Sequence, residues 1–343
     1  MSVTDPTRER AAVATRRTRG APRPLTYFDD GSVIRRVLRE RAVALSGARA
    51  LLMQAAHPLA VAGLLAHSDS LEDPYLRLAR TAEVMNTITF GTRADADRMT
   101  RRVRAMHRSV RGALPESVGI YPAGTPYRAD DPRLLLWILY TLIDSAIVLY
   151  ETYVGRLDTA DREALWQDYR VIGRLFGLRM TQMPADYSEL VSYGRRMLGG
   201  DELQVGDWAR RRAREIVLEP PVPSRMRPVL ETVNFIVIAL LPAQIRSQYG
   251  FAPLPPAFVR RALVQAGAVY VRRGVLPLLP TRVRELPAAR RAVSRPRSAR
   301  RRVGVPQLTA DTSASGSAAI SASVLTPNTS WWVPAAAHTI SKR

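Results

Sequence analysis

The stretch Asp73–Gly112 reads DPYLRLARTAEVMNTITFGTRADADRMTRRVRAMHRSVRG and predicts two helices joined by a turn around Gly91. In the first helix, Arg77, Arg80 and Thr81 share one face, because residues three and four apart lie on the same side of an α-helix. The second helix carries an apolar stripe at helical spacing, which predicts its inward face. The stripe consists of Met99, Val103, Met106 and Val110.

His107 lies beside this stripe, four residues after Val103 and three before Val110. An imidazole on the inner side of one helix can meet arginines and a hydroxyl from the other. Such a set can hold an iron porphyrin, with neutral histidine as the axial ligand. However, a histidine at an apolar helix edge is more often a structural core residue, and an Arg-rich helix face is commonly solvated. Spacing alone leaves both interpretations open.

Several other segments follow one another along the chain in a recognisable order. They are QAAHPLAVAGLLAHS (Gln54–Ser68), DPYLRLARTAEVM (Asp73–Met85), the H-x-x-V-x-G pattern of His107, Val110 and Gly112, YRADDPRLLLW (Tyr127–Trp137), LIDSAIVLYETYVGRL (Leu142–Leu157) and LLPAQIR (Leu240–Arg246). Through them, about residues 28–255 resemble the MpaB / rubber oxygenase (latex-clearing protein) catalytic-domain family. The resemblance implies an all-helical fold with b-type haem, which uses dioxygen to oxidise apolar, often isoprenoid, substrates.

The same resemblance implies roles for individual residues. His107 is then the proximal iron ligand. Arg77 and Thr81 match the family's R-x-x-[KR]-T motif on the oxygen-binding side. Arg80 stands where rubber-cleaving members carry a lysine that can cap the iron. The chain departs from the family at Leu139, where many members have the histidine of a W-V-H-A-T segment. This departure puts in doubt the polar contact that the histidine makes.

The amino-acid composition limits the kinds of metal or cofactor site that the chain can form. Hydrophobic residues make up 46% of the 343 positions, which is enough for a sizeable core. The chain has 0 cysteines, so disulfides, thiolate haem ligation and cysteine-based zinc or iron–sulfur sites are excluded. The 4 histidines limit the ligands for any iron to His57, His67, His107 and His338.

Charge suggests another class of function. The formal net charge is +21, and residues 258–302 hold 13 arginines against one acidic residue, Glu285. This excess of arginine is typical of proteins that bind nucleic acid or an anionic membrane, although a GC-rich genome raises the arginine content of its proteins in the same way. The alternatives to a haem oxygenase are therefore a non-catalytic basic helical binding protein and a haem protein that senses or stores without turnover. A Soret band favours haem, whereas steeply salt-dependent DNA binding favours the basic binding protein.

Composition also predicts the domain organisation. We expect a disordered basic segment over residues 1–24, one globular helical domain over 25–275, and a basic then Ser/Ala-rich tail over 276–343. No apolar run follows the twin arginine Arg16–Arg17, so a secretory signal is not predicted and we expect a cytoplasmic protein. The tail is a candidate for weak contact with an anionic membrane or nucleic acid.

His57 precedes Pro58 within residues 32–66, where two helices are expected with a break near Ser46–Gly47. Proline disfavours helical geometry at the residue before it, so a kink at His57 is predicted. Such a kink can turn the imidazole into a pocket. The other interpretation is a buried structural histidine.

The most apolar stretch runs from Leu134 to Tyr150 and contains one charge, Asp144. A central carboxylate disfavours a membrane span, so a buried core helix is predicted. Burial requires a partner for Asp144, and an arginine or a histidine nitrogen is the natural one. Asp144 would then orient or neutralise a group near the cofactor.

Further helices are expected over residues 158–176, from Asp186, from Asp207, over 229–241 and over 256–274. The last of these is amphipathic and basic, with one apolar side. That side is formed by Val259, Leu263, Ala266 and Val269. The predicted fold class is all-α with a single globular domain.

Overall fold

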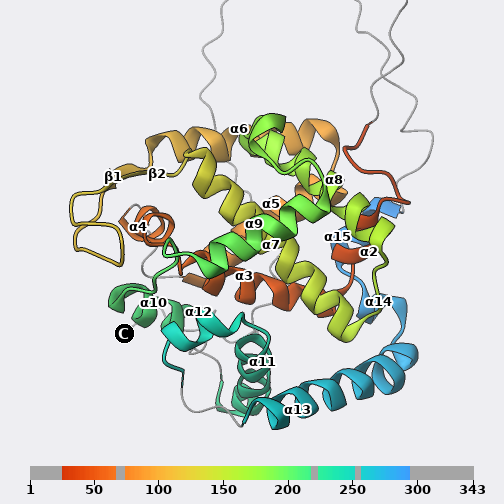
Figure 1. Cartoon of the computed structure of the whole chain (residues 1–343). Coiled ribbons are helices and arrows are strands. Elements are labelled where there is room, and N and C mark those ends of the chain that lie inside the picture. Colours follow the sequence, from red (N-terminus) through yellow and green to blue (C-terminus); the bar gives the residue numbers. More distant parts are fainter. Residues whose placement is uncertain (1–24, 67–73, 218–222, 252–255, 294–343) are drawn as a thin grey trace, which may run out of the picture.

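The computed structural model of the chain describes residues 25–66, 74–217, 223–251 and 256–293, and it is almost entirely helical (Figure 1). Its α-helices are α2 (Val33–Leu38), α3 (Ser46–Gln54), α4 (Pro58–Ala66), α5 (Pro74–Phe90), α6 (Arg93–Ser109), α7 (Pro132–Tyr153), α8 (Thr159–Phe176), α9 (Tyr187–Gly199), α10 (Asp207–Val217), α11 (Arg227–Ala239), α12 (Ala243–Gln248), α13 (Ala257–Tyr270), α14 (Thr281–Arg284) and α15 (Pro287–Val293). Short turns are η1 (Arg41–Leu45), η2 (Met180–Gln182), η3 (Ser224–Met226), η4 (Val271–Val275, a π turn) and η5 (Leu276–Leu278). Strands β1 (Arg111–Ala113) and β2 (Pro126–Arg128) form one antiparallel hairpin. The all-α prediction is confirmed, and the expectations for residues 1–24 and 294–343 lie outside the described residues.

Helix α7 lies near the centre of the helical body (Figure 1). It begins where the Asp131 side chain accepts a hydrogen bond from the Arg133 N–H, with Pro132 in the first turn, a favoured way to start a helix. Trp137, Ile143 and many other side chains of α7 are buried, chiefly against α3 and α8. The predicted core helix is confirmed.

Helix α7 is also the one helix in the described part of the chain that is long and apolar enough to cross a membrane. Sixty-one per cent of its apolar window is buried inside the fold, as in the core helix of a globular protein. Because most of this window is buried inside the fold, the length and composition of α7 are weak evidence for a transmembrane segment.

Helices α8 and α9 begin at the predicted residues. The Asp158 side chain accepts from Asp161 N, and the Asp186 side chain accepts from Glu189 N. These contacts satisfy backbone donors that lack partners in the first turn of a helix. Helix α8 ends at Gly177, whose φ of 109° lies in the left-handed region that glycine tolerates best.

The first part of the chain has more breaks than predicted. The break expected near Ser46–Gly47 is present, because η1 ends at Leu45 and α3 begins at Ser46, and a further break falls at Arg39–Glu40, before η1. Helix α3 is held by its apolar side chains, and Leu52 and Met53 are fully buried. The kink at His57 is confirmed, because α3 ends at Gln54 and α4 starts with Pro58.

Helices α5 and α6 form the predicted hairpin. Gly91 makes the close turn, since a Cβ there would lie 2.3 Å from the Thr87 carbonyl oxygen, and Thr92 caps α6 by accepting from Asp95 N. The predicted inward stripe of α6 is wrong in detail. Its buried residues are Ala96 and Thr100, whereas the four stripe residues are half-buried or exposed, with Met106 54% exposed. Small side chains let α6 approach its neighbours, and the longer ones lie at the edge.

The packed body continues past residue 275, where composition predicts an end. Leu286, Ala289 and Ala292 are buried against Phe90 of α5. Leu286 N donates to the Arg39 carbonyl at 2.8 Å. A short apolar repeat thus suffices to anchor a segment whose overall composition is basic.

Candidate functional site

His57 occupies the junction between α3 and α4. Its backbone is held on both sides: His57 N donates to Gln54 O at 3.1 Å, and its carbonyl accepts from Ala60 N and Val61 N. The residue is 3% exposed, and its Nδ1 atom has no hydrogen-bond partner among the described residues. A buried polar atom left unsatisfied costs stability, so it is a candidate for a ligand contact.

The protonation state of His57 follows from its burial. Desolvation lowers its pKa from 6.5 to about 4, the nearby Arg133 guanidinium lowers it further, and Asp131 opposes the shift. The imidazole is therefore neutral at physiological pH. A neutral imidazole offers a nitrogen lone pair to a metal or to a proton donor.

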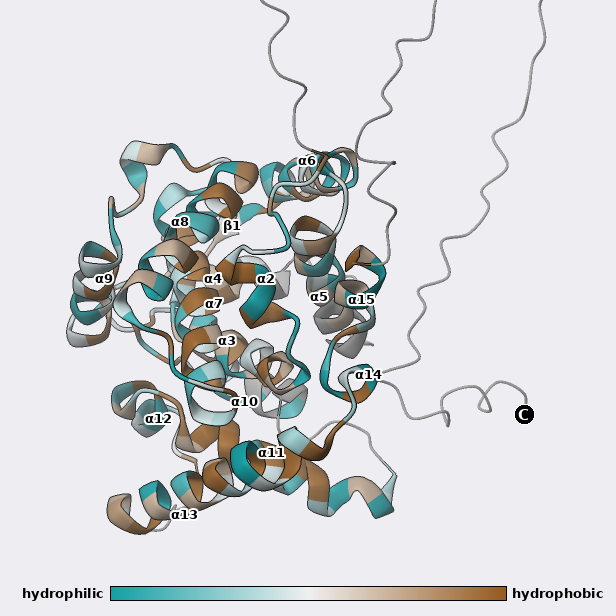
Figure 2. Cartoon of the chain, turned by 90° about the vertical axis from the view of Figure 1, so that its right-hand side faces the viewer, coloured by the Kyte–Doolittle hydropathy of each residue, from teal (hydrophilic) through white to brown (hydrophobic). Residues whose placement is uncertain are grey.

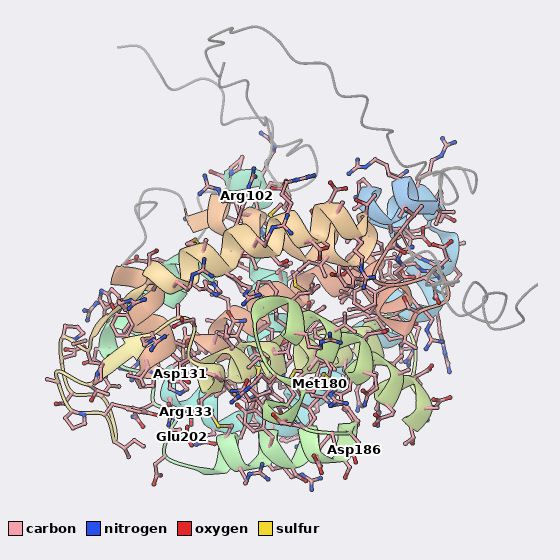
Figure 3. All side chains as sticks on the ribbon, turned by 90° about the horizontal axis from the view of Figure 1, so that it is seen from above. Arg102, Asp131, Arg133, Met180, Asp186 and Glu202 are labelled. Atoms are coloured by element: carbon pink, nitrogen blue, oxygen red, sulfur yellow. The ribbon has the colours of Figure 1, made fainter. Side chains whose placement is uncertain are left out.

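Tyr121 covers the His57 ring from the loop between β1 and β2. The ring centroids lie 5.6 Å apart with the planes tilted by 33°. Burial raises the pKa of Tyr121, with Glu202 raising it further and Arg133 lowering it. Asp131, Arg133 and Glu202 gather at this side of the molecule (Figure 3). The site thus joins an aromatic wall to a rim of charges.

A polar strip runs between α3 and α7 beside this junction. Gln54 Nε2 donates to Thr141 Oγ1 at 3.0 Å. The Arg49 guanidinium contacts Asp144 Oδ2 at 2.8 Å, Ser145 Oγ at 2.7 Å and the Leu240 carbonyl at 2.9 Å. The predicted pairing of Asp144 is confirmed, with Arg49 as its partner. Any effect of Asp144 on a cofactor is therefore indirect.

His107 sits in the last turn of α6 and is half-buried. Its ring stacks near Phe176 of α8, with the centroids 6.4 Å apart and the planes inclined by 26°. An aromatic wall of this kind suits an imidazole that must keep one orientation.

The residues after His107 join the segments of the family pattern. A Cβ at Gly63 would lie 3.4 Å from Val110, and Gly112 pairs with Tyr127 across the hairpin so tightly that a Cβ would lie 2.6 Å from the Tyr127 hydroxyl. These contacts belong to a cluster that we call the α4 cluster. Its buried members are Leu59, Ala62, Leu114, Tyr127 and Leu134. Three stretches distant in sequence therefore converge beside α4.

Arg77, Arg80 and Thr81 lie on α5, the partner of α6 in the hairpin. Arg80 and Thr81 are exposed, and the side chain of Arg77 lies outside the described residues, as does His67. The structure brings the two predicted helices together. The contact of these three side chains with His107 stays a prediction.

Leu139 occupies the position where relatives carry a histidine. It is 4% exposed and faces Gly173 of α8, where a Cβ would lie 3.0 Å from its Cδ2 and 2.5 Å from Met183 Sδ. The side chain is part of the main apolar core. No polar function can come from this position in this chain.

Sequence reasoning missed Arg49, Gln54 and Thr141 as contact residues. A signal for the first was present, since Arg49 is the one charged residue of α3 and Asp144 the one charge between Leu134 and Tyr150. Two isolated opposite charges on apolar helices predict a buried pair. For Tyr121 the signal is its place in a long Pro- and Gly-rich loop, which is typical of functional loops, although loop geometry decides which residue its ring meets.

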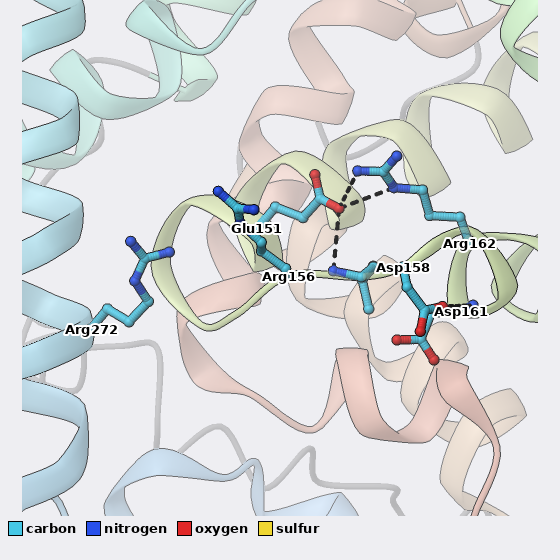
Figure 4. A pocket seen from close by; sticks show the side chains of 7 residues that line it. Glu151, Arg156, Asp158, Asp161, Arg162 and Arg272 are labelled. Carbon is cyan, nitrogen blue, oxygen red and sulfur yellow. Dashed lines mark hydrogen bonds and ion pairs between the residues drawn. The ribbon is translucent and has the colours of Figure 1, made fainter.

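A cleft of about 630 Å³ lies at the other end of α7 (Figure 4). It is lined by Glu151, Arg156, Leu157, Asp158, Asp161, Arg162 and Arg272. Glu151 binds Arg162 at 2.7 Å, and Asp161 pairs with Arg36. Along α7, at 1.5 Å per residue, the cleft lies about 27 Å from Arg133, so it is separate from the His57 site.

The described residues fit an iron porphyrin better than a metal ion bound by side chains alone. Within the part of the chain that the structure describes, no group of three or more His, Asp or Glu side chains is arranged so that it could hold a metal ion. A porphyrin supplies four ligands itself and needs one or two from the protein. Among the described residues, the buried His57 and the half-buried His107 could each supply such a ligand.

Comparisons with known proteins identify a family. A family model described as "ER-bound oxygenase mpaB/B'/Rubber oxygenase, catalytic domain" matches residues 34–273. Similar curated proteins include an uncharacterized protein of Mycobacterium bovis and one of Mycobacterium tuberculosis, each 26% identical over 175 residues. The alignment covers 51% of this chain and 65% of each relative, so the chain spans less than two thirds of their length. No solved structure is significantly similar.

Proposed function

The chain belongs to the family of ER-bound oxygenase mpaB/B' and rubber oxygenase catalytic domains, and from this premise we propose that it is a haem b-dependent oxygenase. It would use dioxygen to oxidise or cleave an apolar, isoprenoid-like substrate. The observation that carries the proposal is the family match over residues 34–273, which includes every residue of the proposed site.

His107 would hold the iron through a ring nitrogen, and its position beside Phe176 supports that role. When bound, haem b supplies the redox chemistry that activates dioxygen. His57 would face the cofactor or substrate as a neutral imidazole, since its pKa of about 4 leaves the ring uncharged near neutral pH, and Nδ1 would then accept a hydrogen bond or donate one, according to tautomer.

Arg77 and Thr81 would act on the side where dioxygen binds, and Arg80 would control the access of small ligands to the iron. A fixed guanidinium stabilises negative charge that develops during a reaction, and such preorganised donors are worth about 10²–10³-fold in rate. Asp144 would act only through Arg49, whose three contacts fix α3 against α7 and thereby fix Gln54 and His57. The α4 cluster would offer apolar contact to the substrate.

The proposal is tested by measuring haem occupancy and oxygen uptake on one preparation, with squalene as the apolar alkene. Arg77→Ala should keep the Soret band and lose about 10²–10³-fold in oxygen uptake. Arg102→Ala is the matched control, because Arg102 is an exposed arginine of α6 (Figure 3). Weakened haem binding would make Arg77 a propionate clamp. Undiminished uptake at full occupancy would contradict its role in turnover.

Leu139 favours one second candidate, a haem protein that senses or stores without turnover. The apolar side chain is buried in the core where relatives present a histidine, so one polar group that accompanies the family's chemistry is missing. A protein with full haem occupancy and no oxygen uptake with any apolar alkene would support this candidate.

A further inference from the structure

Helix α13 exposes its apolar side. Phe258 is 74% exposed, Tyr270 69%, Leu263 51% and Val269 40%. Single exposed apolar residues are common on protein surfaces, whereas a contiguous set marks a contact surface. Helices α11 and α13 lie together at the lower edge of the body, and α13 shows long hydrophobic stretches there (Figure 2).

The exposed residues of α13 form one continuous face. At about 100° per residue, they fall within an arc of about 140° that contains no charged side chain. The arc consists of Phe258, Val259, Ala262, Leu263, Ala266, Val269 and Tyr270. We call it the α13 face, and it includes the apolar side that the sequence predicts for this helix.

The opposite side of α13 is anchored to the body. Ala268 is buried against Leu149 and Tyr153 of α7, together with residues of α11. The helix therefore cannot rotate to bury the α13 face without breaking this contact. The exposed orientation is a property of the fold.

Positive charge borders the α13 face on both sides. Arg260 and Arg261 lie about 60° beyond its two edges, and Arg272 and Arg273 follow the helix end. Residues 256–293 contain eight arginines and one acidic residue, Glu285, which is engaged by Arg39 at 3.5 Å. An apolar face flanked by arginines is the pattern of a helix that lies in the interface of an anionic bilayer.

From this arrangement, we infer that the α13 face docks on the surface of an anionic phospholipid bilayer. Phe258, Leu263 and Tyr270 enter the headgroup–acyl boundary, and the flanking arginines contact phosphates. A second copy of the chain fits less well, because two such faces in contact bring their arginines together. Nucleic acid matches the arginines and leaves the apolar arc without a partner.

The test uses the full chain, and its lack of cysteine permits a single labelled position. Ala262→Cys, carrying the environment-sensitive dye NBD, is mixed with phosphatidylcholine vesicles with or without about one third phosphatidylglycerol, a share that gives the surface a negative potential. The emission should shift to the blue only with the anionic vesicles. A label at Met180→Cys, 41% exposed on another face, should not shift. No shift at position 262, or equal shifts at both positions, would overturn the inference.

A second measurement separates the α13 face from the basic tails, which are present in every variant. Phe258→Ser combined with Leu263→Ser should weaken sedimentation with anionic vesicles by about tenfold or more, since apolar burial drives interfacial binding. Met180→Ser combined with Val293→Ser removes the same number of exposed apolar side chains and should bind like the unmodified chain. Equal binding by both double variants would assign vesicle binding to charge alone. The proposal would also be contradicted if the unmodified chain formed a dimer and bound no vesicles, and if only the Phe258→Ser, Leu263→Ser variant were monomeric.

Discussion

Arg49 and His57 lie eight residues apart and are buried to the same extent, 3% exposed each. They differ in how many of their polar atoms have hydrogen-bond partners. Arg49 meets a carboxylate, a hydroxyl and a backbone carbonyl. His57 keeps Nδ1 without a hydrogen bond in the described structure and stays neutral. The satisfied group fixes the fold, whereas the unsatisfied one leaves an atom for a ligand. The predictions below test this division.

The largest effect is expected from breaking the satisfied group. Asp144→Ala leaves the buried Arg49 guanidinium without its counter-ion, which should lower the free energy of unfolding by about 3–5 kcal/mol. Urea denaturation at pH 7 measures it. Arg98→Ala is the control, because the ion pair of Arg98 with Asp95 is largely exposed and should contribute at most about 1 kcal/mol. Equal losses in the two variants would contradict the structural role of the Arg49 pair.

The next effect concerns pH. Between pH 6.5 and about 4 the unfolded chain binds a proton at His57 that the folded chain does not, so stability from this residue is complete above pH 6.5 and is lost as the pH falls. The loss reaches about 3 kcal/mol, at about 1.4 kcal/mol per pKa unit. His57→Phe should lack this component. Comparing urea midpoints of both proteins from pH 7.5 to pH 4 isolates it, and parallel curves would show that His57 titrates normally.

A smaller effect is expected at pH 7 from His57→Phe itself. Replacing an unsatisfied polar ring by an apolar ring of similar shape should change the free energy of unfolding by less than about 1 kcal/mol. Oxygen uptake should fall instead, at unchanged haem occupancy. A loss of stability as large as that of Asp144→Ala would place His57 among the structural residues.

The smallest effect is expected where the two regions meet. Thr141→Val keeps the shape of the side chain and removes the acceptor of Gln54 Nε2, so it should cost about 1 kcal/mol. Thr152→Val, which loses only a bond to the Val148 carbonyl within α7, is the control. No difference between the variants would mean that the Gln54 contact does not couple α3 to α7.

Local signals predicted much of the fold. Asp158 and Asp186 start α8 and α9, Pro58 separates α3 from α4, and the apolar run with a single charge is the core helix α7. These features depend on neighbouring residues, which the sequence displays directly.

Predictions that depend on packing partners were less accurate. The side of α6 that was predicted to face inward is half-buried or exposed, and α15 packs against Phe90 beyond the predicted end of the domain. At the site, the pairing of Asp144 could be predicted because an isolated buried charge demands a partner, but the contact of Tyr121 with the His57 ring could not, because it depends on loop geometry.

The central claim is that the chain binds one haem b through His107. The direct test is the absorption spectrum and iron content of the chain reconstituted with hemin, compared with His107→Ala and His57→Ala. We expect a Soret band and one iron per chain for the unmodified protein and for His57→Ala, and loss of both for His107→Ala. A normal Soret band and full iron content in His107→Ala would contradict the assignment, and their loss in His57→Ala alone would transfer it to His57.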